Sequence, residues 1–94
     1  MTYEIEFSEK ALKEWKKLDS SIKTIFKKKL NKLQSSPRVE SAKLSGLTDC
    51  YKIKLRSSGF RLVYQVIDDE IIILVIAVGK REGQAVYIDA KKRI

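Results

Sequence analysis

A run of eight consecutive apolar residues, Ile71–Val78, limits the fold of this 94-residue chain more than any other feature of its sequence. A strand with one face in solvent alternates apolar and polar residues, whereas a run that is apolar at every position fits a strand buried on both faces. The run is also far shorter than the roughly 20 apolar residues that cross a bilayer. It therefore predicts a buried strand in a core built around one sheet, and no segment that spans a membrane.

Two more strands are predicted directly before this run. Cys50–Arg56 alternates as a strand with one buried face does. One face carries Tyr51, Ile53 and Leu55, and the other carries Lys52, Lys54 and Arg56. Ser57–Gly59 has the composition of a three-residue hairpin turn, Phe60–Ile67 is the return strand, and Asp68–Glu70 is a second tight turn. Three consecutive strands joined by tight turns predict an antiparallel meander.

The N-terminal part predicts a strand and two helices. Tyr3–Phe7 alternates as a strand does, and Ser8 is a good N-cap for a first helix. Asp19–Ser21 breaks the helical pattern and begins a second helix, which Pro37 cannot continue. With a short helix over residues 84–94, the order is β-α-α-β-β-β-α. We expect a single α+β domain over residues 1–94, in which a helical hairpin and a short C-terminal helix cover one face of a four-stranded antiparallel sheet.

Lysine and arginine outnumber aspartate and glutamate by 20 to 12, which gives a net charge of +8. Such an excess favours a polyanionic partner, which is nucleic acid, an anionic membrane surface or an acidic protein. A generic basic surface, as many small domains have, is the alternative that composition leaves open.

The chain contains no histidine, and this absence excludes more chemistry than any other count. Ser-His-Asp and Cys-His triads, histidine-based metal sites and the two-histidine ribonuclease mechanism all require that residue. Cys50 is the single cysteine, so no intramolecular disulfide can form, and the first ten residues lack the apolar run of a signal peptide. We expect a cytoplasmic protein that uses no metal and no cofactor, with Cys50 as a small strand residue.

Cations gather on one face of the predicted meander. Lys52 and Lys54 lie two residues apart on one strand, so their side chains leave the same face about 6–7 Å apart. The hairpin returns Arg61 beside them, and Arg81 follows the buried strand. These four cations are expected to converge on one sheet surface. The alternative is an exposed sheet that lysines protect from aggregation.

A cationic site of this kind has the groups that RNA cleavage needs. RNA supplies its own nucleophile, the 2′-hydroxyl beside each phosphate. In-line attack then needs a base, positive charge on the phosphorane and an acid for the leaving 5′-oxygen. A lysine crowded by other cations has a lowered pKa and can act as the base or the acid, whereas an arginine stays charged and suits charge stabilisation.

The lysines of the two predicted helices form a second group. Each one taken alone is interpreted as part of a solvated face, but together they can hold a large RNA through counterion release. The group comprises Lys10, Lys13 and Lys17 on the first helix and Lys23, Lys27 and Lys28 on the second.

Several stretches resemble the RelE family of bacterial toxins. The longest is Asp49–Ile67, and Val78–Glu82, Ala11–Leu18 and Ser36–Arg38 fit the same family. The resemblance covers essentially the whole chain. It implies a compact fold with a four-stranded antiparallel sheet, ribosome-dependent cleavage of mRNA in the A site beside the 16S rRNA, and inhibition of translation. It further implies neutralisation by a RelB-like antitoxin, and repression of a shared operon together with that antitoxin.

The resemblance also implies a catalytic set. According to this resemblance, Lys54 is the base, Lys52 helps to lower the pKa of Lys54, and Arg61 holds the phosphate. Arg81 stabilises the leaving side, and Tyr87 orients the nucleotide or stacks on it. The sequence departs from the family pattern close to Tyr87, where Gly83–Ala85 is less charged than the family pattern.

Two other functions remain open at this point. The first is a ribosome-independent ribonuclease of the same superfamily, which the lack of histidine disfavours because such relatives usually use a histidine or glutamate base. The second is a non-catalytic module that binds nucleic acid or an antitoxin, which the presence of all five candidate residues disfavours.

Overall fold

The structure is a computed structural model that describes residues 2–80 and 85–94. Over these residues the chain forms strands and helices in the predicted order, with two short 3₁₀ turns added. The elements are β1 (Glu4–Phe7), α1 (Glu9–Lys16), α2 (Ser20–Leu33), β2 (Cys50–Lys54), β3 (Phe60–Ile67), β4 (Ile72–Lys80) and α3 (Ala85–Arg93), and the 3₁₀ turns are Glu40–Ala42 and Asp68–Glu70.

The four strands form one sheet in the order β1-β4-β3-β2. The pairs β2–β3 and β3–β4 are antiparallel, so the predicted meander is confirmed. The prediction that the whole sheet is antiparallel is wrong, because β1 runs parallel to β4, with Glu4 opposite Ile72. Only a tight turn forces neighbouring strands to run in opposite directions, and two helices and two strands separate β1 from β4 along the chain.

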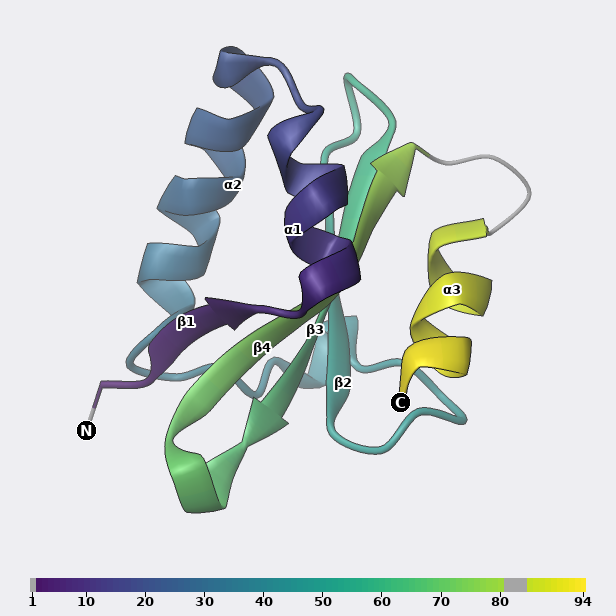
Figure 1. The fold of residues 1–94 in the computed structure, drawn as a ribbon. Coiled ribbons are helices and arrows are strands. Elements are labelled where there is room, and N and C mark those ends of the chain that lie inside the picture. Colours follow the sequence, from purple (N-terminus) through teal and green to yellow (C-terminus); the bar gives the residue numbers. More distant parts are fainter. Residues whose placement is uncertain (1, 81–84) are drawn as a thin grey trace.

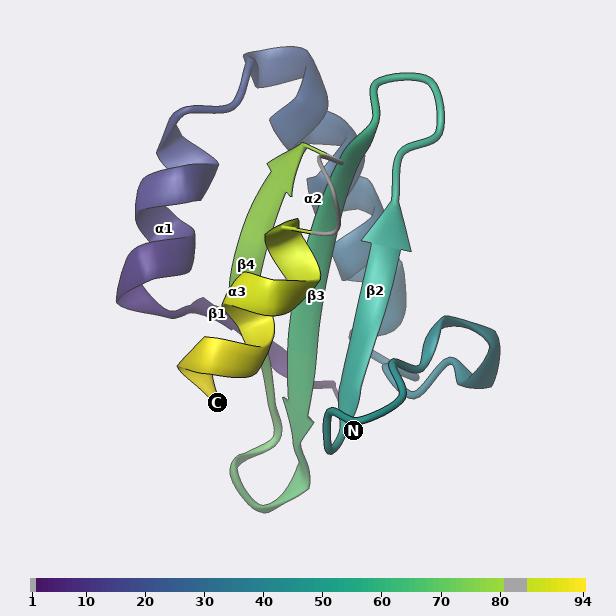
Figure 2. The same cartoon turned by 90° about the vertical axis from the view of Figure 1, so that its right-hand side faces the viewer.

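The helices lie on both faces of the sheet, which corrects the expectation that they share one face. Figure 1 shows α1 and α2 on one side, and Figure 2 shows α3 crossing β3 and β4 on the other. The first side holds the main core, which includes Trp15 and Phe26. Under α3 lies a second, smaller core, which includes Val63, Ile76 and Val86. Because β4 is apolar on both faces, each face needs a cover.

Most helices and strands begin and end where residues close in sequence favour it. The Ser8 hydroxyl accepts a hydrogen bond from the backbone N–H of Ala11 at 3.2 Å, as an N-cap residue does. The β2–β3 turn is longer than predicted, since Leu55 N–H donates to the Phe60 carbonyl and Arg56 therefore belongs to the turn. Gly59, at φ of 77°, adopts the left-handed conformation there that glycine accommodates without strain.

A β-bulge interrupts the pairing of β3 with β4. Val63 lies opposite Ala77, whereas the next residue, Tyr64, lies opposite Val75, so Ile76 is the extra residue on β4. A bulge bends its strand and leaves one residue outside the ladder. The backbone N–H and C=O groups of β4 near Ile76 therefore need hydrogen-bond partners outside the β3–β4 ladder.

The loop between α2 and β2 is tied to the sheet by polar contacts. The buried Tyr64 hydroxyl donates to the Pro37 carbonyl at 2.8 Å. Arg38 donates to Asp49 at 2.9 Å and to Asp68 at 2.6 Å. Asp68 also accepts a hydrogen bond from the Tyr3 hydroxyl at 2.6 Å. This bond and then the Arg38 contact lower the pKa of Asp68.

Among the helices described, none has the length and apolar composition to cross a membrane.

Candidate active site

The predicted cations of the meander lie on the face of the sheet that carries α3. Lys54 is the register partner of Arg61, and Lys52 is the partner of Val63. Val63 packs in the core beneath α3, and side chains at alternate positions of a strand share a face. Lys52, Lys54 and Arg61 therefore point to the same side, as the alternation predicted.

Tyr87 of α3 lies directly against Arg61. The Arg61 guanidinium donates from Nη1 to the Tyr87 hydroxyl at 2.8 Å, and its Cζ lies 5.4 Å from the centre of the tyrosine ring. Both side chains are half-buried. The structure thus joins two predicted site residues that are 26 positions apart in sequence. Arg81, the fifth member of the predicted set, lies outside the described residues.

Gly79 gives α3 room to approach the sheet. It lies opposite Arg61 in the β3–β4 pairing. A Cβ atom added at Gly79 would lie 3.2 Å from Cγ2 of Val86, the residue before Tyr87. Such a contact is tighter than most that proteins show, so a side chain here would move either Val86 or the strand. A small residue at position 79 therefore permits the contact between Tyr87 and Arg61.

A hollow of about 370 Å³ opens beside these residues, lined by Lys54, Leu55, Arg56, Gly59 and Arg61. Three of the five lining residues are cations, so the hollow suits a phosphate group. Within residues 2–80 and 85–94, no cluster of three or more potential metal-ligating residues occurs. The side chains at the hollow that can stabilise negative charge are Lys54, Arg56 and Arg61.

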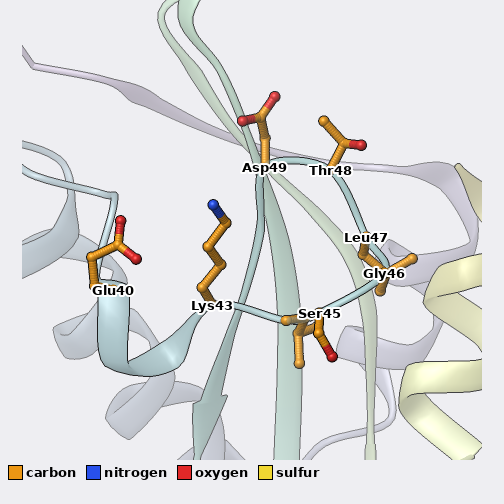
Figure 3. A pocket seen from close by; sticks show the side chains of 8 residues that line it. Glu40, Lys43, Ser45, Gly46, Leu47, Thr48 and Asp49 are labelled. Atoms are coloured by element: carbon orange, nitrogen blue, oxygen red, sulfur yellow. The ribbon is translucent and has the colours of Figure 1, made fainter.

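A larger hollow, of about 690 Å³, lies at the opposite end of β2 and does not include the predicted site residues. Its wall is the loop before β2, and Figure 3 shows Glu40, Lys43 and Asp49 around its opening. The lining mixes acidic, cationic and neutral residues, so it lacks the uniform positive charge that an RNA backbone requires. We place the candidate active site at the smaller hollow.

The predicted lysines of the helices are mostly exposed, on the side of the sheet opposite Arg61 and Tyr87. Lys23 is half-buried, and its Nζ donates to the Lys16 carbonyl at 3.5 Å.

Two other lysines, which the sequence argument did not select, connect the two sides. Lys29 and Lys32 of α2 line a groove of about 340 Å³ together with Lys52 and Lys54. Because β2 is an edge strand, a helix packed against it brings its own lysines to that edge.

Cys50 is fully buried on β2, as the interpretation of a small strand residue predicted. Its burial, followed by the negative charge of Asp49, raises the pKa of the thiol to about 11. A thiol with this pKa is almost entirely protonated at neutral pH and is a poor nucleophile.

Comparison with known proteins finds a matching family and similar relatives. The family of ParE toxins of the type II toxin–antitoxin system parDE matches residues 5–85. The mRNA interferase toxin RelE of Escherichia coli is 58% identical over 94 residues, which cover 100% of this chain and 99% of that protein.

Solved structures of that toxin show the same fold. A mutant of Escherichia coli RelE in the free state aligns with a TM-score of 0.92 and 57% identity, covering 100% of this chain and 99% of the other. The mutant in complex with a peptide of the antitoxin RelB aligns over the same shares of both chains, with a TM-score of 0.83 and 57% identity. The full-length identity, the fold and the family match all lead to one conclusion: the chain belongs to the RelE/ParE family of toxins from type II toxin–antitoxin systems.

Proposed function

We propose that this chain is an mRNA interferase that cuts messenger RNA in the ribosomal A site, in the bacterial cytoplasm, and so inhibits translation. The observation that carries the proposal is the position of Arg61, which lies opposite Lys54 and against Tyr87 at the rim of a cationic hollow. The 58% identity to a protein named mRNA interferase toxin RelE supports it.

In the proposed reaction, the 2′-hydroxyl of the message attacks the adjacent phosphorus and the 5′-oxygen of the next nucleotide leaves. Lys54 takes the proton from the 2′-hydroxyl, and Lys52 assists by adding positive charge on the same face. Arg61 binds the phosphate, because a guanidinium that gives one N–H to Tyr87 keeps others for phosphate oxygens. Arg81 stabilises the leaving 5′-oxygen, which takes up a proton from water to become the 5′-hydroxyl, and Tyr87 orients the nucleotide.

The ribosome supplies what the site lacks. Without histidine, proton transfer depends on lysines that must be placed accurately against the reacting atoms. Holding those atoms in line lowers a barrier by roughly 7–11 kcal/mol, and a flexible single strand offers a small protein little help with this. The exposed lysines of α1 and α2 bind the surrounding 16S rRNA while the opposite face holds the codon.

An antitoxin similar to RelB neutralises the protein, and the pair represses its own operon. Escherichia coli RelE has been crystallised in an intact RelBE toxin–antitoxin complex, and that toxin chain aligns at 59% identity with a TM-score of 0.82. An acidic antitoxin segment complements the net charge of +8 and covers the basic face.

Two measurements test the proposal. Single-turnover cleavage of one message is compared free in solution and programmed into the A site, with EDTA present at a level that leaves the ribosomes intact. We expect fast cleavage only on the ribosome, with a 2′,3′-cyclic phosphate and a 5′-hydroxyl as products. Equal rates in the two settings favour the ribosome-independent ribonuclease. A 5′-phosphate product, or cleavage at a 2′-deoxy position, excludes the mechanism.

A further inference from the structure

An ion pair joins helices on opposite faces of the sheet. Glu14 of α1 accepts two hydrogen bonds from Arg93 of α3, one at 2.8 Å from Nη1 to Oε1 and one at 3.2 Å from Nη2 to Oε2. The side chains are 27% and 17% exposed, so the pair is far more shielded than an ordinary surface ion pair. A shielded, two-pronged pair of this kind holds its geometry, whereas most surface pairs contribute little.

The pair forms where β1 stops covering the edge of β4. The last register pair of these strands is Phe7 with Val75, so within the described part of the chain β4 continues beyond it without a strand on that side. There the backbone N–H of Val78 donates to Glu14 at 3.1 Å, and the Ile76 carbonyl accepts from Arg93 at 2.8 Å. The two side chains therefore replace the missing strand around the β-bulge.

The pair fastens the end of α3 to α1 and β4. The helix buries only two of its residues, Val86 and Ala90. Arg93 ends the helix and bonds to both α1 and β4, while Asp89 lies 3.8 Å from it on the exposed side. Tyr87 belongs to the same helix, so any movement of α3 also moves its hydroxyl away from Arg61.

We propose that Glu14 and Arg93 are positioning residues for RNA cleavage, which act by holding α3 so that Tyr87 stays against Arg61. The inference rests on the proposed function for its catalytic part only. Neither residue reaches the cationic hollow, and both act through the helix that they fasten.

The first test measures how firmly α3 is held, without ribosomes. Hydrogen exchange of the α3 amides is compared in wild type, Arg93→Ala and Lys92→Ala. The second variant removes the same charge from an exposed neighbouring residue. We expect protection of the α3 amides to fall about 10- to 100-fold in Arg93→Ala, as for the loss of hydrogen bonds to a charged group, and to stay unchanged in Lys92→Ala. Unchanged protection in Arg93→Ala overturns the proposal.

The second test asks whether the pair acts through Tyr87. Single-turnover rates and KM on programmed ribosomes are measured for Arg93→Ala, Tyr87→Ala and the double variant. If the pair acts by placing Tyr87, Arg93→Ala lowers kcat about 10-fold or more, leaves KM nearly unchanged, and has no further effect once Tyr87 is absent. Effects that multiply in the double variant overturn the proposal.

Milder variants keep the test valid if Arg93→Ala is too unstable to assay. Glu14→Gln keeps one acceptor oxygen for Val78 and Arg93 but loses its charge and the second bond to Arg93, and Arg93→Lys also keeps only part of the contact, so we expect intermediate losses of kcat from both. Unchanged α3 protection in both variants, with neither losing as much kcat as Tyr87→Ala, contradicts the proposal. A Tyr87→Ala variant with full activity refutes the role of Tyr87 in the proposed function, and the exchange experiment still decides whether the pair holds α3.

Discussion

Replacing Arg61 with alanine removes two interactions that the structure shows and one that the proposed mechanism requires. Within the protein, the variant lacks the hydrogen bond to the Tyr87 hydroxyl and the cation–π interaction with its ring. These two interactions contribute about 1 kcal/mol and about 0.5–1 kcal/mol respectively. The substitution also removes a like charge from opposite Lys54, which returns about 0.2–1 kcal/mol.

The net loss of stability is therefore about 1 kcal/mol. In a domain of this size it lowers Tm by about 4–8 °C. A domain with an ordinary free energy of unfolding of about 5–15 kcal/mol stays folded after such a loss. Lost activity in this variant then reports on chemistry rather than on unfolding.

The expected loss of activity is much larger. Removing one preorganised group that stabilises transition-state charge lowers kcat by about 10²-fold or more. The assay is single-turnover cleavage on A-site-programmed ribosomes, with Tm measured on the same preparations. Lys13→Ala is the matched control, because it removes the same charge from the helical face that is proposed to hold rRNA, and we expect it to raise KM rather than to lower kcat. Equal losses from the two variants would refute the reasoning, because they would show that only overall charge matters.

Three further predictions concern stability and reactivity. Tyr64→Phe leaves the Pro37 carbonyl without its buried donor and should cost about 1–3 kcal/mol in a denaturant titration; an unchanged midpoint would contradict this. The Cys50 thiol, with its pKa raised to about 11, should resist iodoacetamide at pH 8 until guanidinium unfolds the chain, and rapid labelling of native protein would show that it is accessible. The hydrogen bond from Tyr3 contributes most to the lowered pKa of Asp68, so this carboxylate stabilises the fold above about pH 4 and loses that effect as pH falls through its folded-state pKa. Asp68→Asn should accordingly lower Tm at pH 6 by an amount that shrinks as the pH falls below about 4, whereas a constant difference would argue against the linkage.

The elements of this fold could be predicted because their signals are local. The alternation of Cys50–Lys54 and the N-cap at Ser8 each depend on a few neighbouring residues. The direction of β1 could not be predicted, since alternation shows which face is buried and not which strand is the neighbour. The position of α3 was open to inference, because a strand as apolar as Ile72–Lys80 needs cover on its second face.

For the candidate site too, some residues could be placed from the sequence and others could not. Lys54 and Arg61 could be placed together because a hairpin sets the register of its two arms. Tyr87 came from the resemblance to a family, and only the tertiary structure brings it to Arg61. The pair of Glu14 and Arg93 had no signal in the sequence, because a contact across 79 positions leaves no periodic pattern.

The parallel pairing of β1 with β4 has a consequence for how the toxin is made. Glu4 pairs with Ile72, which is synthesised 68 positions later, so the first strand has no partner during most of translation. Pairings across such separations form slowly, and they cannot begin before both strands exist. The α1–α2 hairpin likewise lacks the sheet against which its apolar side packs. A chain whose synthesis stops before β4 therefore has neither the complete four-stranded sheet nor the contact between Tyr87 and Arg61. Stalled or truncated products of synthesis should accordingly be harmless to the cell that makes them.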